Sequence, residues 1–133
     1  MPASAALLGA RLLLSFLFLA SGLSALGDIA GTTAYFSSLG LPAPTLVAWL
    51  TCLFELAAGV LVVIGFGTRA AALLLAAFSV AAGFIGHYGQ GGEDATLALM
   101  HSQALMKDIA IGGGFLALAV AGAGAWSVDA RRG

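Results

Sequence analysis

Apolar residues form four long runs in this chain, separated by shorter and more polar segments. A transmembrane helix needs roughly 17–25 mostly apolar residues, and each run falls in that range. The runs cover residues 7–26, 46–65, 70–86 and 109–125. The pattern therefore predicts an all-α membrane protein, a bundle of four transmembrane helices.

The segments between the runs predict how the helices are joined. Residues 27–44 are polar and glycine-rich, and two prolines near their end stop one element and start the next. Residues 65–69 (Gly-Phe-Gly-Thr-Arg) predict a tight turn, which makes the second and third helices antiparallel neighbours. In the third segment, Glu93 and Asp94 suit the amino end of a helix dipole. We therefore expect residues 95–106 to be helical, either lying at the interface or extending the fourth span outward.

The composition supports a membrane location. Of 133 residues, 61% are hydrophobic and only 8% are charged, and the mean hydropathy is +1.06. A soluble domain carries about 25% charged residues, so lipid must face most of this surface. The four runs use most of the chain, which indicates one domain over residues 1–133. With a net charge of −1 and no large basic cluster, nucleic-acid binding has no support.

The positions of the basic residues predict the orientation. With four spans both termini lie on one side, and basic residues favour the cytoplasmic side. Lys107 alone falls on the other side, whereas four arginines share the side of the termini: Arg11, Arg69, Arg131 and Arg132. We expect both termini in the cytoplasm and the protein in a bacterial inner (cytoplasmic) membrane, crossing it several times.

Glu55 stands out because it is the only charged residue in the second apolar run. A carboxylate near the bilayer centre costs about 2.5–3.5 kcal/mol on insertion scales, so its helix should turn it into the bundle interior. There it could be a structural carboxyl, a protonated carboxyl hydrogen-bonded to a neighbouring helix, or a ligand or proton site. Arg11 lies inside the first run and could reach Glu55 or extend to the inner head groups.

Further ionisable residues gather near the predicted outer ends of the third and fourth helices. His87 ends the third run, and Asp108 precedes the fourth. A histidine and a carboxylate could pass a proton there or hydrogen-bond a quinone carbonyl, or they could be ordinary interfacial polar residues. Tyr35 lies near a predicted helix boundary, and we interpret it as an interfacial residue rather than one that stacks on a cofactor. The predicted ligand pocket consists of Arg11, Glu55, His87, Lys107 and Asp108.

Independent catalysis has little support in the sequence. No nucleophile–base pair can be read from the spacing, so we expect no catalytic residues of its own. His87, Glu93, Asp94 and His101 match no tight metal-ligand motif, and we expect no bound metal and no covalently bound cofactor. Cys52 is the only cysteine and is interpreted as a small apolar residue.

Several short segments match, in order and spacing, a known family of small membrane proteins. They are RLLL at 11–14, FLASG at 18–22, GLP at 40–42, FELAAG at 54–59, GFGTR at 65–69, His87, Lys107-Asp108 and GAGAWSVD at 122–129. Together they resemble the DoxX family of four-helix integral membrane proteins, over nearly the whole chain. The family commonly has an H-G-x-x-K-like stretch at the end of the first span. Here residues 21–25 read Ser-Gly-Leu-Ser-Ala, so small side chains replace both polar ones.

The resemblance implies a role in redox assemblies. Some relatives look like membrane components of oxidoreductases, including a thiosulfate:quinone oxidoreductase, and others are tied to complexes with soluble redox enzymes. We therefore expect an accessory or quinone-binding (small-ligand-binding) subunit of a membrane-associated redox system, with redox enzymes as partners besides the lipid bilayer. Two alternatives stay open: a small-molecule carrier, for which small residues permit homo-oligomers, and a scaffold that recruits soluble enzymes.

Overall fold

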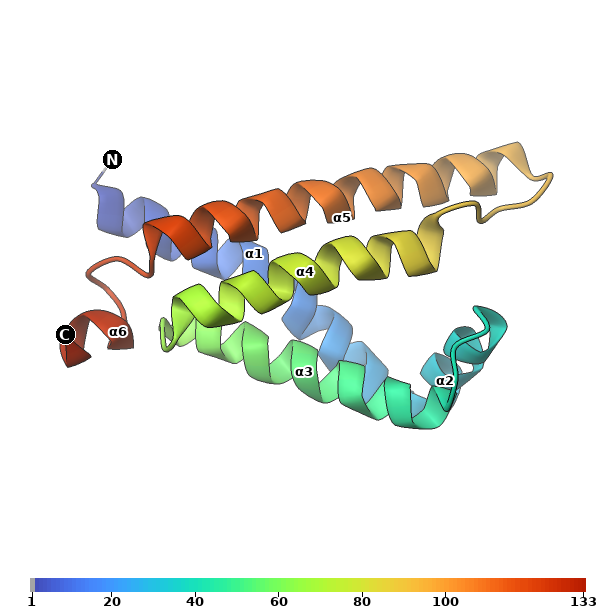
Figure 1. Ribbon diagram of the computed structural model, residues 1–133, viewed down its shortest axis with the longest axis horizontal. Helices are drawn as coiled ribbons and strands as arrows, with labels where there is room; N and C mark the ends of the chain where they lie inside the picture. Colours follow the sequence, from blue (N-terminus) through green and yellow to red (C-terminus); the bar gives the residue numbers. More distant parts are fainter. Residues whose placement is uncertain (1) are drawn as a thin grey trace.

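Six helices make up the computed structural model, which describes residues 2–133 (Figure 1). They are α1 (Ala3–Gly27), α2 (Ile29–Ser38), α3 (Pro44–Ile64), α4 (Thr68–His87), α5 (Ala95–Ala121) and α6 (Val128–Arg132). Four of them, α1, α3, α4 and α5, are long and apolar enough to cross a membrane. No strand occurs within residues 2–133. The predicted all-α fold with four transmembrane helices is confirmed.

The fourth spanning helix differs from the run of residues 109–125 that the apolar pattern predicts. α5 begins at Ala95, where the Asp94 side chain accepts a hydrogen bond from the Leu97 N–H, and continues without a break to Ala121. The acidic helix start is therefore confirmed, and residues 95–106 extend the span rather than lie at the interface. The helix ends earlier than expected because Gly122, with φ +82°, leaves the helical conformation.

α2 is a helix that the apolar pattern did not predict. It lies in the segment of residues 27–44, which reads as a polar, glycine-rich connection. Its start is fixed by Asp28, whose side chain accepts a hydrogen bond from the Gly31 N–H. An aspartate at this position stabilises a helix start, so the signal was present but short.

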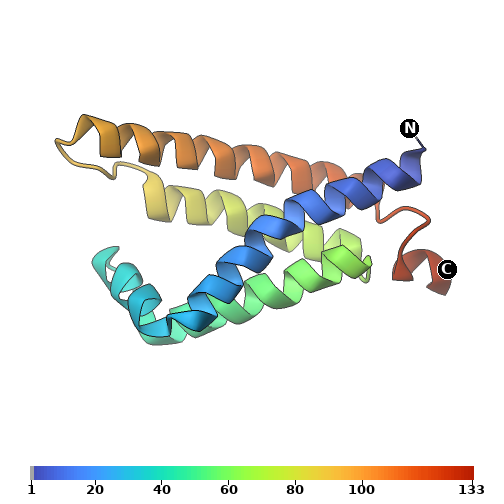
Figure 2. The same cartoon turned by 180° about the vertical axis from the view of Figure 1, so that it is seen from behind.

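The spanning helices associate as two antiparallel pairs. α4 packs most extensively against α5, and α1 against α3, whereas contacts between the pairs are fewer. We call the α1–α3 pair and the α4–α5 pair the two arms. The arms lie close together at the end that carries both termini and diverge toward the end that carries α2 (Figures 1 and 2). We call these the termini end and the α2 end.

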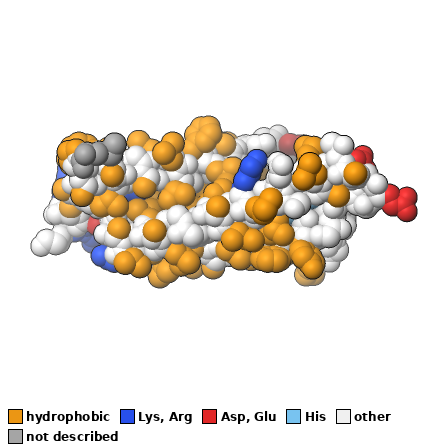
Figure 3. All heavy atoms as spheres, turned by 90° about the horizontal axis from the view of Figure 1, so that it is seen from above, with side chains coloured by type: hydrophobic (Ala, Val, Ile, Leu, Met, Phe, Trp, Pro, Cys, Tyr) orange, Lys and Arg blue, Asp and Glu red, His pale blue; other side chains and the backbone are white. Residues whose placement is uncertain are grey.

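Small residues bring the helices of each arm close together. A side chain at Gly22 of α1 would place its Cβ 2.7 Å from Leu56 of α3, and the Cys52 thiol donates to the Gly22 carbonyl at 3.2 Å. In the other arm, a Cβ at Gly112 would lie 2.8 Å from Val80. Close backbone approach of this kind drives helix association in lipid. Outside, hydrophobic side chains cover much of the long face in Figure 3, as a lipid-facing surface requires.

Four phenylalanines, one from each spanning helix, join the two arms at the centre. Ring centroids lie 5.0 Å apart for Phe54 and Phe78, 5.6 Å for Phe18 and Phe115, and 6.0 Å for Phe18 and Phe78. Aromatic pairs at such distances contribute about 0.5–1.5 kcal/mol each beyond their buried area. This phenylalanine cluster is part of the apolar core shared by the two arms.

Arg11 joins α1, α3 and the segment after α5 at the termini end. Its side chain is only 2% exposed and donates four hydrogen bonds to backbone carbonyls. Two acceptors lie in the last turn of α3, Val62 at 3.0 Å and Val63 at 2.6 Å. The others lie in the segment after α5, Ala123 at 2.8 Å and Trp126 at 2.9 Å. The guanidinium therefore neither pairs with Glu55 nor extends to the head groups, because it is hydrogen-bonded to carbonyls at the end of α3 and in the segment after α5.

Replacing Arg11 should destabilise the bundle strongly. Arg11→Ala removes all four bonds, and since each bond to a charged group is worth about 1.5–3 kcal/mol, we expect a loss of at least about 3 kcal/mol. Unfolding in detergent with increasing denaturant measures the loss. Leu13→Ala, which changes a side chain 79% exposed on the same helix, is the matched control and should change stability little. Equal stabilities for the two variants would contradict this role of Arg11.

Candidate functional site

Two histidines and an aspartate lie together at the α2 end of the α4–α5 arm. His87 is the last residue of α4, and its Nδ1 lies 2.9 Å from Nδ1 of His101 on α5. Its other ring nitrogen, Nε2, lies 3.8 Å from Oδ2 of Asp108. At least one imidazole must be neutral here, because one Nδ1 donates the hydrogen and the other accepts it. The pair can therefore hold and exchange a proton next to a carboxylate.

Small and polar neighbours on α4 position Asp108. Gly83 allows close approach, since a Cβ added there would lie 2.8 Å from the Cβ of Asp108. Ser79 donates from its hydroxyl to the main-chain carbonyl of Asp108 at 2.9 Å. The side chains of His87 and Asp108 keep 27% and 22% exposure, so both remain accessible to a small ligand.

Tyr35 connects α2 to the end of α4, next to His87. Its hydroxyl donates to the carbonyl of Gly86, near the end of α4, at 3.2 Å. Burial raises the pKa of Tyr35, and the nearby negative charge of Asp108 raises it further. The sequence alone suggested only an interfacial aromatic residue, because the helix that carries Tyr35 was not predicted. We call Tyr35, His87, His101 and Asp108 the histidine cluster.

Glu55 faces the interior from the other arm. It is 6% exposed and lies seven residues, or two helical turns, before the core residue Val62. Asp108 likewise precedes the core residue Phe115 by seven residues. Each carboxyl group therefore lies on the same helix face as its core residue. The Ser21 hydroxyl of α1 is a hydrogen-bonding neighbour of Glu55.

The five predicted pocket residues do not converge on one place. The structure brings His87 and Asp108 together, whereas Glu55 is buried in the other arm. Arg11 lies at the termini end, and Lys107 is exposed, with no ion pair to any residue of 2–133. Within the same residues, no group of three histidine, cysteine or acidic side chains is arranged to hold a metal ion.

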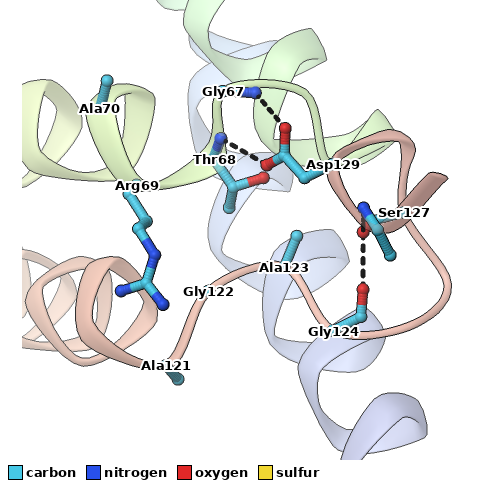
Figure 4. A pocket seen from close by; sticks show the side chains of 11 residues that line it. Gly67, Thr68, Arg69, Ala70, Ala121, Gly122, Ala123, Gly124, Ser127 and Asp129 are labelled. Carbon is cyan, nitrogen blue, oxygen red and sulfur yellow. Dashed lines mark hydrogen bonds between the residues drawn. The ribbon is translucent and has the colours of Figure 1, made fainter. Parts of the chain in front are cut away.

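A second polar site lies at the termini end, around α6. Asp129 accepts hydrogen bonds from the N–H groups of Gly67 at 2.8 Å and Thr68 at 2.9 Å, at the start of α4 (Figure 4). Its own N–H donates to the Gly65 carbonyl at 2.8 Å. The Thr68 N–H contributes most to a pKa of Asp129 below its usual range, and the Gly67 N–H and the charge of Arg132 add to this. These bonds fix α6 against the α3–α4 turn.

The ionisation of Tyr35 tests the histidine cluster. The chain has two tyrosines, so Tyr88→Phe leaves Tyr35 as the only one. Its pKa, followed by ultraviolet difference absorbance, should lie above the ordinary value of about 10. Asp108→Asn should lower this pKa because it removes the neighbouring charge, but burial should keep it raised. Glu93→Gln, which changes an exposed acidic residue in the loop before α5, should leave the pKa of Tyr35 unchanged. Equal changes of this pKa in Asp108→Asn and Glu93→Gln would contradict the contact between Tyr35 and Asp108.

The docking of α6 should depend on pH through Asp129. Because its pKa is lowered in the folded protein, ionised Asp129 stabilises docking above the ordinary carboxyl pKa of about 3.9. That stability is lost as the pH falls through the lower folded-state pKa. Fluorescence of Trp126 in a Trp49→Phe background reports the docking. Asp129→Asn should weaken docking at neutral pH and abolish the acid transition, and an unchanged transition would contradict the assignment.

Comparison with known proteins agrees with this architecture. The DoxX family model matches residues 6–88. Inner membrane protein YqjF of Escherichia coli (strain K12) is 35% identical over 122 residues, which are 90% of this chain and 86% of the relative. Inner membrane protein YphA of the same organism is 36% identical over 126 residues, 94% and 89% of the two chains. No solved structure matches significantly. The chain therefore belongs to the DoxX family, as a multi-pass inner-membrane protein.

Proposed function

We propose that the protein binds a quinone, or a similar small ligand with carbonyl groups, between its two arms, as an accessory subunit of a membrane-associated redox system. The observation that carries the proposal is the placement of polar side chains on facing arms. Glu55 is buried on α3 next to Phe54 of the phenylalanine cluster, and the histidine cluster lies on the other arm toward the α2 end. The arms diverge at this end of the bundle (Figure 2).

The residues suit the chemistry of a quinone. A quinone is an apolar ring with two carbonyl oxygens, each of which accepts hydrogen bonds. His87 carries an imidazole donor at the α2 end, and the phenylalanine cluster offers an apolar surface toward the centre. Asp108 and the paired histidines could take up or supply the proton that accompanies a change in quinone oxidation state.

The electrons would come from a partner protein. Membership of the DoxX family supports this, because some relatives look like membrane components of oxidoreductase assemblies. Under this proposal the chain binds and orients the ligand and handles protons, and a soluble or membrane redox enzyme reduces or oxidises it.

Ligand binding to purified protein in lipid nanodiscs tests the proposal. A short-chain ubiquinone analogue should bind in a saturable manner, as measured by isothermal titration calorimetry. His87→Ala and Glu55→Gln should each weaken binding about tenfold, which corresponds to about 1.4 kcal/mol, or one hydrogen bond to the ligand. Lys107→Gln is the control, since this exposed side chain stands apart from the cluster.

Two outcomes would overturn the proposal. One is the absence of saturable binding to the folded protein. The other is binding that His87→Ala, Glu55→Gln and Lys107→Gln leave equally strong, because the ligand would then bind elsewhere on the apolar surface. Leak-tight proteoliposomes in a solute-flux assay would in addition remove the alternative function of a small-molecule carrier.

A further inference from the structure

A hollow of about 580 Å³ opens at the termini end, far from the histidine cluster. It lies between the start of α4, the end of α5 and the segment that leads to α6 (Figure 4). It is lined by residues 67–70, 121–124, 127, 129 and 130. Its size is within the range of about 300–1,000 Å³ typical of small-molecule sites. The function proposed above does not use it.

The guanidinium of Arg69 provides a positive charge on one side of the hollow. Arg69 donates from Nη1 to the carbonyls of Ala119 at 2.8 Å and Val120 at 2.6 Å, which hold the guanidinium against the end of α5. Its Nη2 and Nε have no hydrogen-bond partner among residues 2–133. Gly122 faces them, and a Cβ there would lie 3.2 Å from Nη2. Because Gly122 has no side chain, Nη2 and Nε of Arg69 stay open to a ligand.

The carboxylate of Asp129 provides a negative charge on another side of the hollow. Each oxygen of Asp129 accepts one main-chain N–H, from Gly67 or Thr68, and both bonds hold the carboxylate in place. A carboxylate oxygen has two acceptor positions, so each keeps one for a further donor. The hollow thus presents donors and acceptors of opposite charge on a rigid frame, which matches a ligand that itself carries an anion and a hydrogen-bond donor.

The position in the bilayer indicates the source of such a ligand. α4 begins and α5 ends at the hollow, so it lies where spanning helices meet the head-group layer. Leu73 and Leu74, one turn along α4 from Arg69 and Ala70, are 53% and 58% exposed. On α5, Val120 is 79% exposed. An acyl chain could follow these side chains away from the hollow.

We propose that this hollow is a binding site for one phospholipid headgroup, with the phosphate held by Arg69 and the headgroup's own N–H or O–H donor held by Asp129. The site should prefer ethanolamine or glycerol headgroups, which have such donors. It should reject choline, whose quaternary nitrogen has no hydrogen to donate. Lipids that merely surround the protein would show no such preference.

Native mass spectrometry of the full chain, purified free of lipid in detergent, tests the preference. The probes are phosphatidylethanolamine, phosphatidylglycerol and phosphatidylcholine with identical acyl chains. The first two should bind about tenfold more tightly than the third, the discrimination expected from one charge-assisted hydrogen bond. Equal binding of all three would overturn the proposal. So would equally tight binding of soluble glycerophosphoethanolamine, because the site would then recognise a free phosphodiester.

Matched variants locate the site. Arg69→Gln should abolish the preference, whereas Arg131→Gln, an exposed arginine at the same end that does not line this hollow, should retain it. Arg69→Gln also breaks two bonds to α5, so Ala70→Leu is a second variant. It fills the hollow from an exposed helix position and should abolish the preference without lowering the melting temperature. Retention of the preference in Ala70→Leu would exclude the hollow as the site.

Discussion

The bundle depends on one buried guanidinium. Arg11 enters from α1 and donates to carbonyls of the last turn of α3 and of the segment after α5. It therefore ties three parts of the chain together. Gly65 makes the contact possible: its φ of +72° ends α3, and a Cβ there would lie 3.2 Å from the Arg11 guanidinium carbon. In lipid, where carbonyls without partners are costly, this single side chain closes one end of the molecule.

The opposite end of the bundle is held together differently. Toward the α2 end the arms diverge (Figure 1), and there Tyr35 on α2 donates a hydrogen bond to the Gly86 carbonyl of α4. The histidine cluster, which includes the Asp108 carboxyl, lies in this half. At the termini end, the polar groups mainly join helices. Asp129 and Arg69 make such bonds and also line the hollow.

The candidate site shows where sequence reasoning succeeds. The cost of a carboxylate in lipid correctly predicted that Glu55 faces the interior, and the positions of His87 and Asp108 near helix ends correctly suggested their proximity. Tyr35 was missed because a short helix with a single aspartate cap gives a weak signal. Arg11 was expected either to reach Glu55 or to extend to the inner head groups, whereas the carbonyls that accept its hydrogen bonds come from residues more than fifty positions away.

The sequence by itself determined the environment of the protein and its spanning elements, because hydrophobic length and the cost of charge in lipid act on each segment separately. It also determined the family, through the order of short segments along the chain. The tertiary structure alone decided which helices pair, which end is closed, and which polar groups meet. These features depend on glycines that let a neighbouring helix approach and on backbone carbonyls that accept hydrogen bonds from an arginine. Which helix and which carbonyls are involved is decided only when distant segments pack together.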